Sequence, residues 1–120
     1  MNRLLLPLLL AAPLLASAAE APQAVSADVI RCYERLLERV PKRTPYSSIL
    51  ASESQLAAGQ VERQRSAFSS RISQPVDARV IIRGTGWRER TEVPLWLKCG
   101  LNNGQIVTWE VEKRVSQNPS

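Results

Sequence analysis

Apolar residues recur every three or four positions between Val29 and Val40, with charged residues between them. This spacing is typical of an amphipathic helix, for which Ser26 is a suitable N-cap and Pro41 the expected end. The predicted apolar face is made of Val29, Cys32, Tyr33, Leu36, Leu37 and Val40. Any disulfide from Cys32 would therefore point into the core.

The residues after this helix carry a weaker signal. Pro41 to Ser48 contains two prolines and is expected to form a surface connector. The composition beyond it favours one or two helices between about Ser52 and Phe68, divided at Gly59. Because the apolar stripe of this segment is thin, we expect it to pack loosely or to change position.

After Pro75 the apolar period changes to two, which is typical of half-buried strands. The pattern predicts three strands, at about residues 76–83, 93–99 and 105–115. Gly84-Thr85-Gly86 is expected to form the turn after the first strand. The predicted fold class is α+β, with N-terminal helices packed on a three-stranded antiparallel β-meander. Residues 26–115 would form this small domain and residues 116–120 a polar tail.

The loop between the second and third strands decides which residues face each other. A two-residue turn at Asn103-Gly104 would place Leu97 opposite Glu110 and mix apolar with charged residues on one face. A three-residue loop with Gly104 in a G1 bulge is favoured, because it groups the apolar residues. This register gives the pairs Cys99–Val107, Leu97–Trp109 and Leu95–Val111. The opposite face, expected to be solvated apart from its tryptophan, carries Trp96, Lys98, Thr108, Glu110 and Glu112.

The start of the chain has the composition of a secretory signal peptide, predicted to span residues 1–19. Arg3 gives a positive start, Leu4–Leu15 an apolar core broken by two prolines, and Ala16-Ser17-Ala18 a small-residue cleavage site. No second long apolar run follows, so no transmembrane segment is expected after cleavage. The predicted location is the periplasm, and residues 20–25 are expected to form a disordered leader.

Sixteen Lys and Arg face eleven Asp and Glu, which gives a formal net charge of +5. Removal of Arg3 with the signal peptide leaves fifteen basic and eleven acidic residues, a net charge of +4. This surplus could suit an anionic envelope partner, but the favoured interpretation is a small domain kept soluble by interspersed charges. Nucleic acid is not expected as a partner, because no basic groove with interleaved aromatic residues is recognisable.

The chain contains two cysteines, Cys32 and Cys99, and no histidine. In an oxidising compartment such a pair predicts a disulfide, with free or intermolecular thiols as the alternative. The core-facing position of Cys99 in its strand agrees with the core-facing position of Cys32 in the helix. The absence of histidine removes the usual zinc sites and histidine-activated nucleophiles, so neither a metal nor a cofactor is expected.

The string RGTGWRER, Arg83 to Arg90, is the first candidate contact surface. Arginines beside Trp87 could bind a phosphate or a sugar, although a simple hairpin connection is the favoured interpretation, because no phosphate-loop spacing is present. Trp96 lies opposite the predicted core and marks either a contact surface or a position covered by the chain's own loop or tail. The candidate contact residues are Trp96, Trp87, Arg83, Arg88 and Arg90.

The carboxylates give no catalytic pattern. Glu110 and Glu112 share a sheet face, and Glu89 and Glu92 bracket a basic turn, but both sets are interleaved with Lys or Arg on predicted surface. Neither resembles a tuned acid/base pair. No residue is therefore predicted to be catalytic.

Several short motifs occur together in the second half of the chain. They are Gly84-Thr85-Gly86-Trp87, Pro94 to Gly100 (PLWLKCG), and Val107-Thr108-Trp109-Glu110, preceded by the helical Cys32. In these the chain resembles small exported proteobacterial proteins of the BspC-like kind. The resemblance implies an exported domain and assigns no activity or functional residues. A vaguer similarity is to periplasmic lysozyme inhibitors, from which the long helical first half departs.

These observations lead to the hypothesis of a periplasmic, non-enzymatic binding module. Its partner would be an envelope protein or an anionic envelope ligand. The alternatives are a structural accessory of an envelope assembly, a lysozyme-inhibitor-like protein and a small envelope enzyme that uses carboxylates alone.

Overall fold

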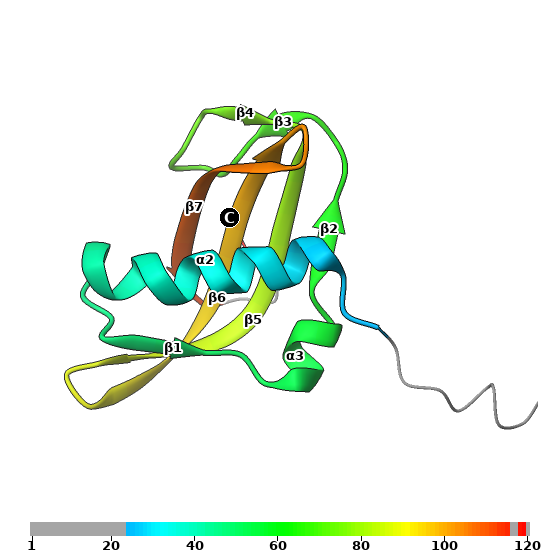
Figure 1. Cartoon of the computed structure of the whole chain (residues 1–120). Coiled ribbons are helices and arrows are strands. Elements are labelled where there is room, and N and C mark those ends of the chain that lie inside the picture. Colours follow the sequence, from blue (N-terminus) through cyan, green and yellow to red (C-terminus); the bar gives the residue numbers. More distant parts are fainter. Residues whose placement is uncertain (1–23, 116–117, 120) are drawn as a thin grey trace, which may run out of the picture.

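The computed structural model describes residues 24–115 and 118–119, so the predicted signal peptide and residues 20–23 of the predicted leader lie outside the described residues. Within these described residues, two helices and seven strands follow in the order α2 (Ala27–Arg43), β1 (Ser48–Leu50), α3 (Glu53–Ala57), β2 (Gln60–Glu62), β3 (Ser66–Ala67), β4 (Pro75–Val76), β5 (Ala78–Arg88), β6 (Thr91–Asn102) and β7 (Gln105–Lys113). Helix α2 crosses one face of the main sheet, here called the front face (Figure 1). The predicted α+β class and the Cys32–Cys99 disulfide are confirmed.

Helix α2 has the predicted start and apolar face but a later end. The Ser26 side chain caps it by accepting a hydrogen bond from the Asp28 amide at 3.2 Å. The helix continues through Pro41, where a proline lacks only one backbone donor, and ends where the Thr44 amide donates to the Val40 carbonyl at 3.0 Å. The expected end at Pro41 is therefore wrong. The fully buried residues of its apolar face are Val29, Cys32, Leu36 and Val40.

The main sheet is larger than the predicted meander. Strands β5, β6 and β7 form its antiparallel centre, and β1 and β2 both pair with the remaining edge of β5, at opposite ends. The prediction of helices across Ser52–Phe68 is wrong except for the five residues of α3, which begin at a Ser52–Gln55 capping box. Beyond Gly59 the chain becomes β2, because pairing with β5 outweighs a weak local helical preference.

The turn between β5 and β6 also differs from the prediction. Gly84-Thr85-Gly86 lies inside β5, and the turn is made by Glu89 and Arg90, which have φ angles of 49° and 73°. The two glycines are needed for packing, because a Cβ at Gly84 would lie 2.7 Å from the Leu97 side chain. A Cβ at Gly86 would similarly lie 2.5 Å from the Leu95 side chain. The leucines of β6 fill the space that the glycines leave.

The β6–β7 hairpin has the two-residue turn that was not favoured, and its bulge lies at Val107 and not at Gly104 as predicted. Asn103 and Gly104 form the turn with φ angles of 53° and 77°. The register then shifts beyond Leu101, which leaves Val107 as the extra residue of β7. The observed pairs are Gly100–Thr108, Cys99–Trp109 and Leu97–Val111. The predicted partners of Cys99 and Leu97 are wrong by two positions, which leaves Trp109 and Val111 against the core as predicted. Val107, also predicted on that face, is displaced by the bulge and 41% exposed, and Ile106 packs against the core instead.

The front face of the sheet and α2 enclose the main core, which includes the disulfide. Cys32 and Cys99 are fully buried there, with their Cα atoms 5.9 Å apart. Val25, the last residue of the predicted leader, packs partly buried against the same core. The helix therefore reaches the sheet through both apolar packing and a covalent bond.

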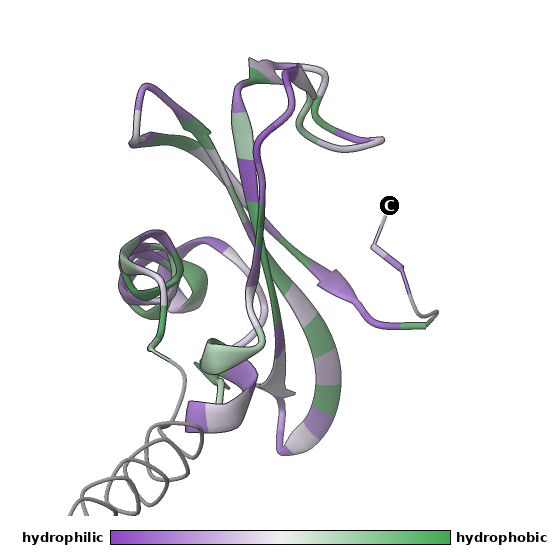
Figure 2. Ribbon diagram, turned by 90° about the vertical axis from the view of Figure 1, so that its right-hand side faces the viewer, coloured by the Kyte–Doolittle hydropathy of each residue, from purple (hydrophilic) through white to green (hydrophobic). Residues whose placement is uncertain are grey.

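The opposite or back face is covered in part by residues 66–76, here called the back flap, which contain β3 and β4. Figure 2 places α2 on one side of the sheet and the C-terminal residues on the other. Phe68 and Val76 of the flap are fully buried, and a Cβ at Gly100 would lie within 2.8 Å of both side chains. The predicted solvated face is therefore wrong, since Lys98 is fully buried and Glu110 only 9% exposed.

Candidate functional site

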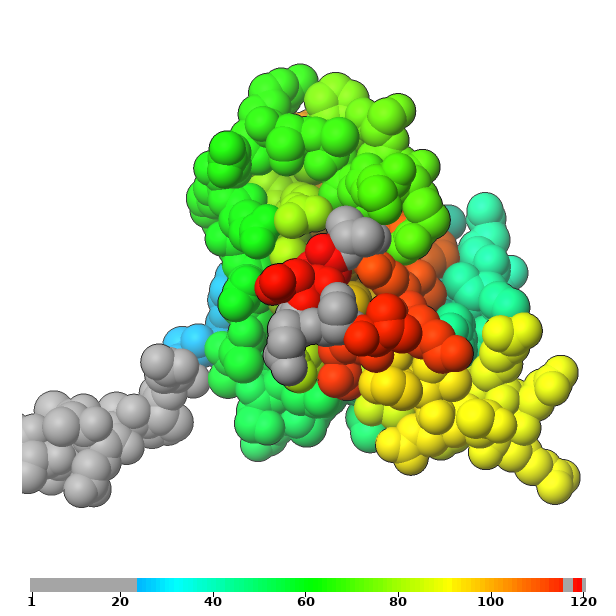
Figure 3. Space-filling model, turned by 180° about the vertical axis from the view of Figure 1, so that it is seen from behind, coloured from blue at the N-terminus to red at the C-terminus, as the bar shows by residue number. Residues whose placement is uncertain are grey.

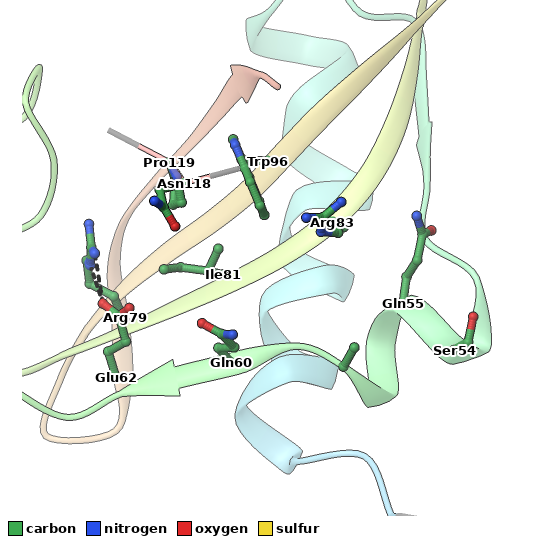
Figure 4. Close-up of a pocket in the computed structure, with 11 residues that line it drawn as sticks. Ser54, Gln55, Gln60, Glu62, Arg79, Ile81, Arg83, Trp96, Asn118 and Pro119 are labelled. Carbon is green, nitrogen blue, oxygen red and sulfur yellow. Dashed lines mark hydrogen bonds and ion pairs between the residues drawn. The ribbon is translucent and has the colours of Figure 1, made fainter. Parts of the chain in front are cut away.

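A cavity of about 550 Å³ opens on the back face of the sheet, and we call it the back groove. Ile81 of β5 and Trp96 of β6 lie between α3 and β2 on one side and the C-terminal residues Asn118 and Pro119 on the other (Figure 4). Seen from behind, the C-terminal residues lie over the sheet between the flap and the β5–β6 hairpin (Figure 3). The groove is thus formed by segments from the middle and the end of the chain.

Strand pleating explains why these side chains meet. Arg79, Ile81 and Arg83 have the same parity in β5 and point to the back face, while their even-numbered neighbours point to the core. Trp96 is directly opposite Arg83 in the β5–β6 pairing. Strand β2 then places Glu62 opposite Arg79.

Trp96 is the central side chain of the groove and is only 5% exposed. The guanidinium carbons of Arg83 and Arg114 lie 5.1 Å and 5.8 Å from the centroid of its ring, within the range of cation–π contacts. Arg114 is held in place by hydrogen bonds of 3.2 Å to the carbonyls of Leu95 and Gly84. The indole therefore sits in a positively charged environment.

The buried Nε1–H of Trp96 has no hydrogen-bond partner among the described residues. Leaving a buried donor unsatisfied costs about 1–3 kcal/mol, and most buried donors in proteins are paired. An oxygen of a bound molecule could accept this hydrogen bond. Trp96 thus combines apolar surface, neighbouring cations and an unused donor.

Arg79 connects the groove to the flap. Its guanidinium donates to the Glu62 carboxylate at 2.7 Å and 3.1 Å, and to the Phe68 carbonyl at 3.0 Å. The Glu62 carboxylate offsets the charge of Arg79, whereas Arg83 and Arg114 face the ring of Trp96. Two guanidinium groups therefore lie beside the tryptophan.

A second cluster of charges lies farther along the same face, beneath the flap. The Lys98 ammonium is 2.8 Å from Glu112 and 3.7 Å from Glu110, and 5.8 Å from the Phe68 ring. Arg71 of the flap forms an ion pair with Glu110 and lies 3.5 Å from Glu112. Two cations thus face two carboxylates, an arrangement that holds the flap to the sheet.

The structure divides the predicted contact surface. Trp96 and Arg83 come together in the groove, but Arg88 and Arg90 are exposed at the tip of the β5–β6 hairpin. The tip lies about five residues, roughly 17 Å, from Arg83 along β5. Trp87 is half-buried near the tip, where its carbonyl accepts a hydrogen bond of 2.9 Å from the Ser47 amide. These three residues therefore line no part of the groove.

The groove also contains residues that the sequence did not single out. Ile81 and Arg79 share the parity of Arg83, so the alternation of β5 could have identified them. Gln60 of β2 gave no comparable signal, because the strand itself was not predicted. Asn118 and Pro119, from the end of the chain, line the groove together with Trp96.

Within residues 24–115 and 118–119, no three or more Cys, Asp or Glu side chains lie close enough together to hold a metal ion. None of the helices that the structure describes is long and apolar enough to cross a membrane. No protein-family model, curated protein or solved structure matches the chain. We therefore infer a function from the geometry of the groove.

Proposed function

We propose that this protein is an exported, periplasmic and non-enzymatic binding module, and that the back groove is its ligand site. The main support for this proposal is Trp96, which lines a cavity of about 550 Å³. Its buried Nε1–H has no hydrogen-bond partner among the described residues, and Arg83 and Arg114 lie beside its ring. The signal-like start of the chain and the disulfide support export to an oxidising compartment.

The ligand should combine an apolar or planar part with an anionic oxygen. Ile81 and Trp96 offer apolar surface, and the arginines beside them favour a carboxylate or phosphate group. Such a group could belong to a segment of an envelope protein or to an anionic envelope ligand. It must either share the groove with Asn118 and Pro119 or displace them.

A site-specific photo-crosslinker tests this proposal in the cell envelope. The crosslinking residue replaces Gln60 at the groove, and Arg90 at the exposed hairpin tip serves as the control position. We expect a defined crosslinked species from position 60 and none from position 90. Equal crosslinking at the two positions, or none at position 60, would contradict the proposal.

Two variants then test the chemistry of the groove. Trp96→Phe keeps an aromatic ring and removes the Nε1–H, while Arg83→Gln removes one of the two neighbouring cations. Each is expected to weaken crosslinking from position 60 by about tenfold, equivalent to the 1–2 kcal/mol of one polar contact to a charged group. Arg83→Lys keeps the charge and should therefore reduce crosslinking from position 60 less than Arg83→Gln does.

The composition of the crosslinked species separates the alternatives. A lysozyme would indicate an inhibitor, and several stoichiometric envelope proteins would indicate a structural accessory. A carboxylate enzyme is less well supported, because Lys98 and Arg71 neutralise Glu110 and Glu112 beneath the flap.

A further inference from the structure

The outer edge of β7 is a second surface of the protein, separate from the back groove. Strand β7 is the last strand of the main sheet, and its nine residues pair only with β6 among the described residues. Figure 1 shows this edge beside the C-terminal half of α2. The backbone amides and carbonyls along an unpaired edge can bind another strand.

The helix beside this edge is strongly basic. From Arg35 to the end of α2 the chain has four basic residues and one acidic residue. Arg35 and Arg39 are half-buried, and neither forms an ion pair or hydrogen bond within the described part of the chain. A hollow of about 450 Å³ lies between the helix and β7, lined by Arg31, Glu34, Arg35 and Glu38 of α2 and by Gln105 and Ile106 of β7. Its charges balance, so the excess positive charge lies farther along α2, at Arg39 and the residues after it.

The side chains of β7 are compatible with an added strand. Trp109 and Val111 are half-buried on the front face, and Val107 at the bulge is 41% exposed, so apolar surface borders the edge. The carboxylates of Glu110 and Glu112 on the back face are neutralised by Lys98 and Arg71. An acidic partner would therefore meet the free arginines of α2 without strong repulsion from β7.

A second copy of the chain is a poorer occupant of this edge. The end of α2 reaches past β7 in Figure 1, so β7-to-β7 pairing would bring two basic helix ends to the same side of the joined sheet. Like charges in such contacts are destabilising. The bulge at Val107 further disfavours continuous pairing between two identical edges.

We propose that the edge of β7 binds an extended, acidic peptide segment of another protein by strand addition, with Arg35 and Arg39 selecting its charge. Main-chain hydrogen bonds to β7 would supply affinity, and the basic end of α2 would select acidic over basic segments. This site adds a partner-binding surface to the proposed function and does not depend on the back groove.

The test uses a displayed library of random nonapeptides, selected on the purified full-length protein. We expect enrichment of sequences rich in Asp, Glu and β-branched residues. Hydrogen exchange followed by NMR should show slower exchange of amides between Val107 and Val111 when a selected peptide is bound. Enrichment of neutral or basic peptides, no enrichment, or binding without protection of β7 amides would overturn the proposal.

A matched pair of double variants tests the role of the helix. The double variant Arg35→Gln, Arg39→Gln is expected to bind the selected acidic peptides about tenfold more weakly. This estimate follows from the typical size of surface charge contacts. Arg88→Gln with Arg90→Gln removes the same charge at the exposed hairpin tip and should change binding by less than about twofold. Equal losses in the two variants would mean that only net charge matters and would refute a site at α2 and β7.

Discussion

Removal of the Cys32–Cys99 disulfide should cost a large part of the folding stability. The bond joins residues 67 positions apart and links α2 to the centre of the sheet. Cross-linking over such a loop lowers the entropy of the unfolded chain by about 15 cal/mol/K in the chain-entropy model, or about 4 kcal/mol at 25 °C. Domains of this size have about 5–15 kcal/mol of stability in total.

Urea unfolding, followed by tryptophan fluorescence, measures this contribution in three forms of the protein. The oxidised and the reduced wild type contain the same side chains, so their difference reports the cross-link itself. The Cys32→Ala, Cys99→Ala double variant adds the loss of two fully buried sulfur atoms. With an m-value of about 1–3 kcal/mol/M, the midpoint should fall by roughly 1.5–4 M on reduction.

A small effect of reduction on the free energy of unfolding would contradict this prediction. If reduction of the wild type lowered the free energy of unfolding by less than about 1 kcal/mol, the loop-entropy argument would be wrong for this chain. An additional loss in the double variant would then be assigned to packing. Mass spectrometry of the unreduced protein provides the control, because it must first show the Cys32–Cys99 cross-linked peptide.

Three further changes test other parts of the structure by urea unfolding. Lys98→Met should cost about 3–5 kcal/mol, because it leaves the buried carboxylates beneath the flap with one cation fewer; a cost below about 1 kcal/mol would contradict this assignment. Gly100→Ala should cost about 1–3 kcal/mol by overpacking against the flap. An unchanged urea midpoint would mean that the flap moves to make room for the methyl group. Hydrogen bonds from Arg63, and then from Arg31, hold the pKa of the Asp28 carboxyl below its ordinary value. That stabilisation is present above the unfolded pKa of about 4 and is lost as the pH falls through the lower folded value. Asp28→Asn should therefore reduce the loss of stability between pH 6 and pH 3, and an unchanged loss would contradict this assignment.

The elements predicted correctly are those with one face against the main core and an opposite face of different polarity. The apolar stripe of α2 and the parity of β6 placed Cys32 and Cys99 on core-facing surfaces, which agreed with the disulfide predicted from the cysteine pair. The same parity kept Trp96 on the back face although the hairpin register was wrong. Periodicity thus identifies faces more reliably than it identifies partners.

The missed elements depend on tertiary pairing. Strands β1 and β2 have three residues each and exist because β5 offers them an edge, which no local pattern reveals. Gly84 and Gly86 were interpreted as turn residues because glycine favours turns, whereas here they make room for leucines of β6. The burial of Lys98 followed from the flap, whose position over the sheet the sequence pattern did not indicate.

The same dependence affects the order in which the segments of the chain can fold. Helix α2, strands β1 and β2, and the back flap all precede residue 78, yet each packs against or pairs with the strands that follow. The part of the chain before residue 78 thus has no sheet to bury its apolar residues until β5 and β6 are present. Cys32 likewise remains without its partner until Cys99 has emerged. Although domains within a chain usually fold in order from the N-terminus, this domain must wait for its last third.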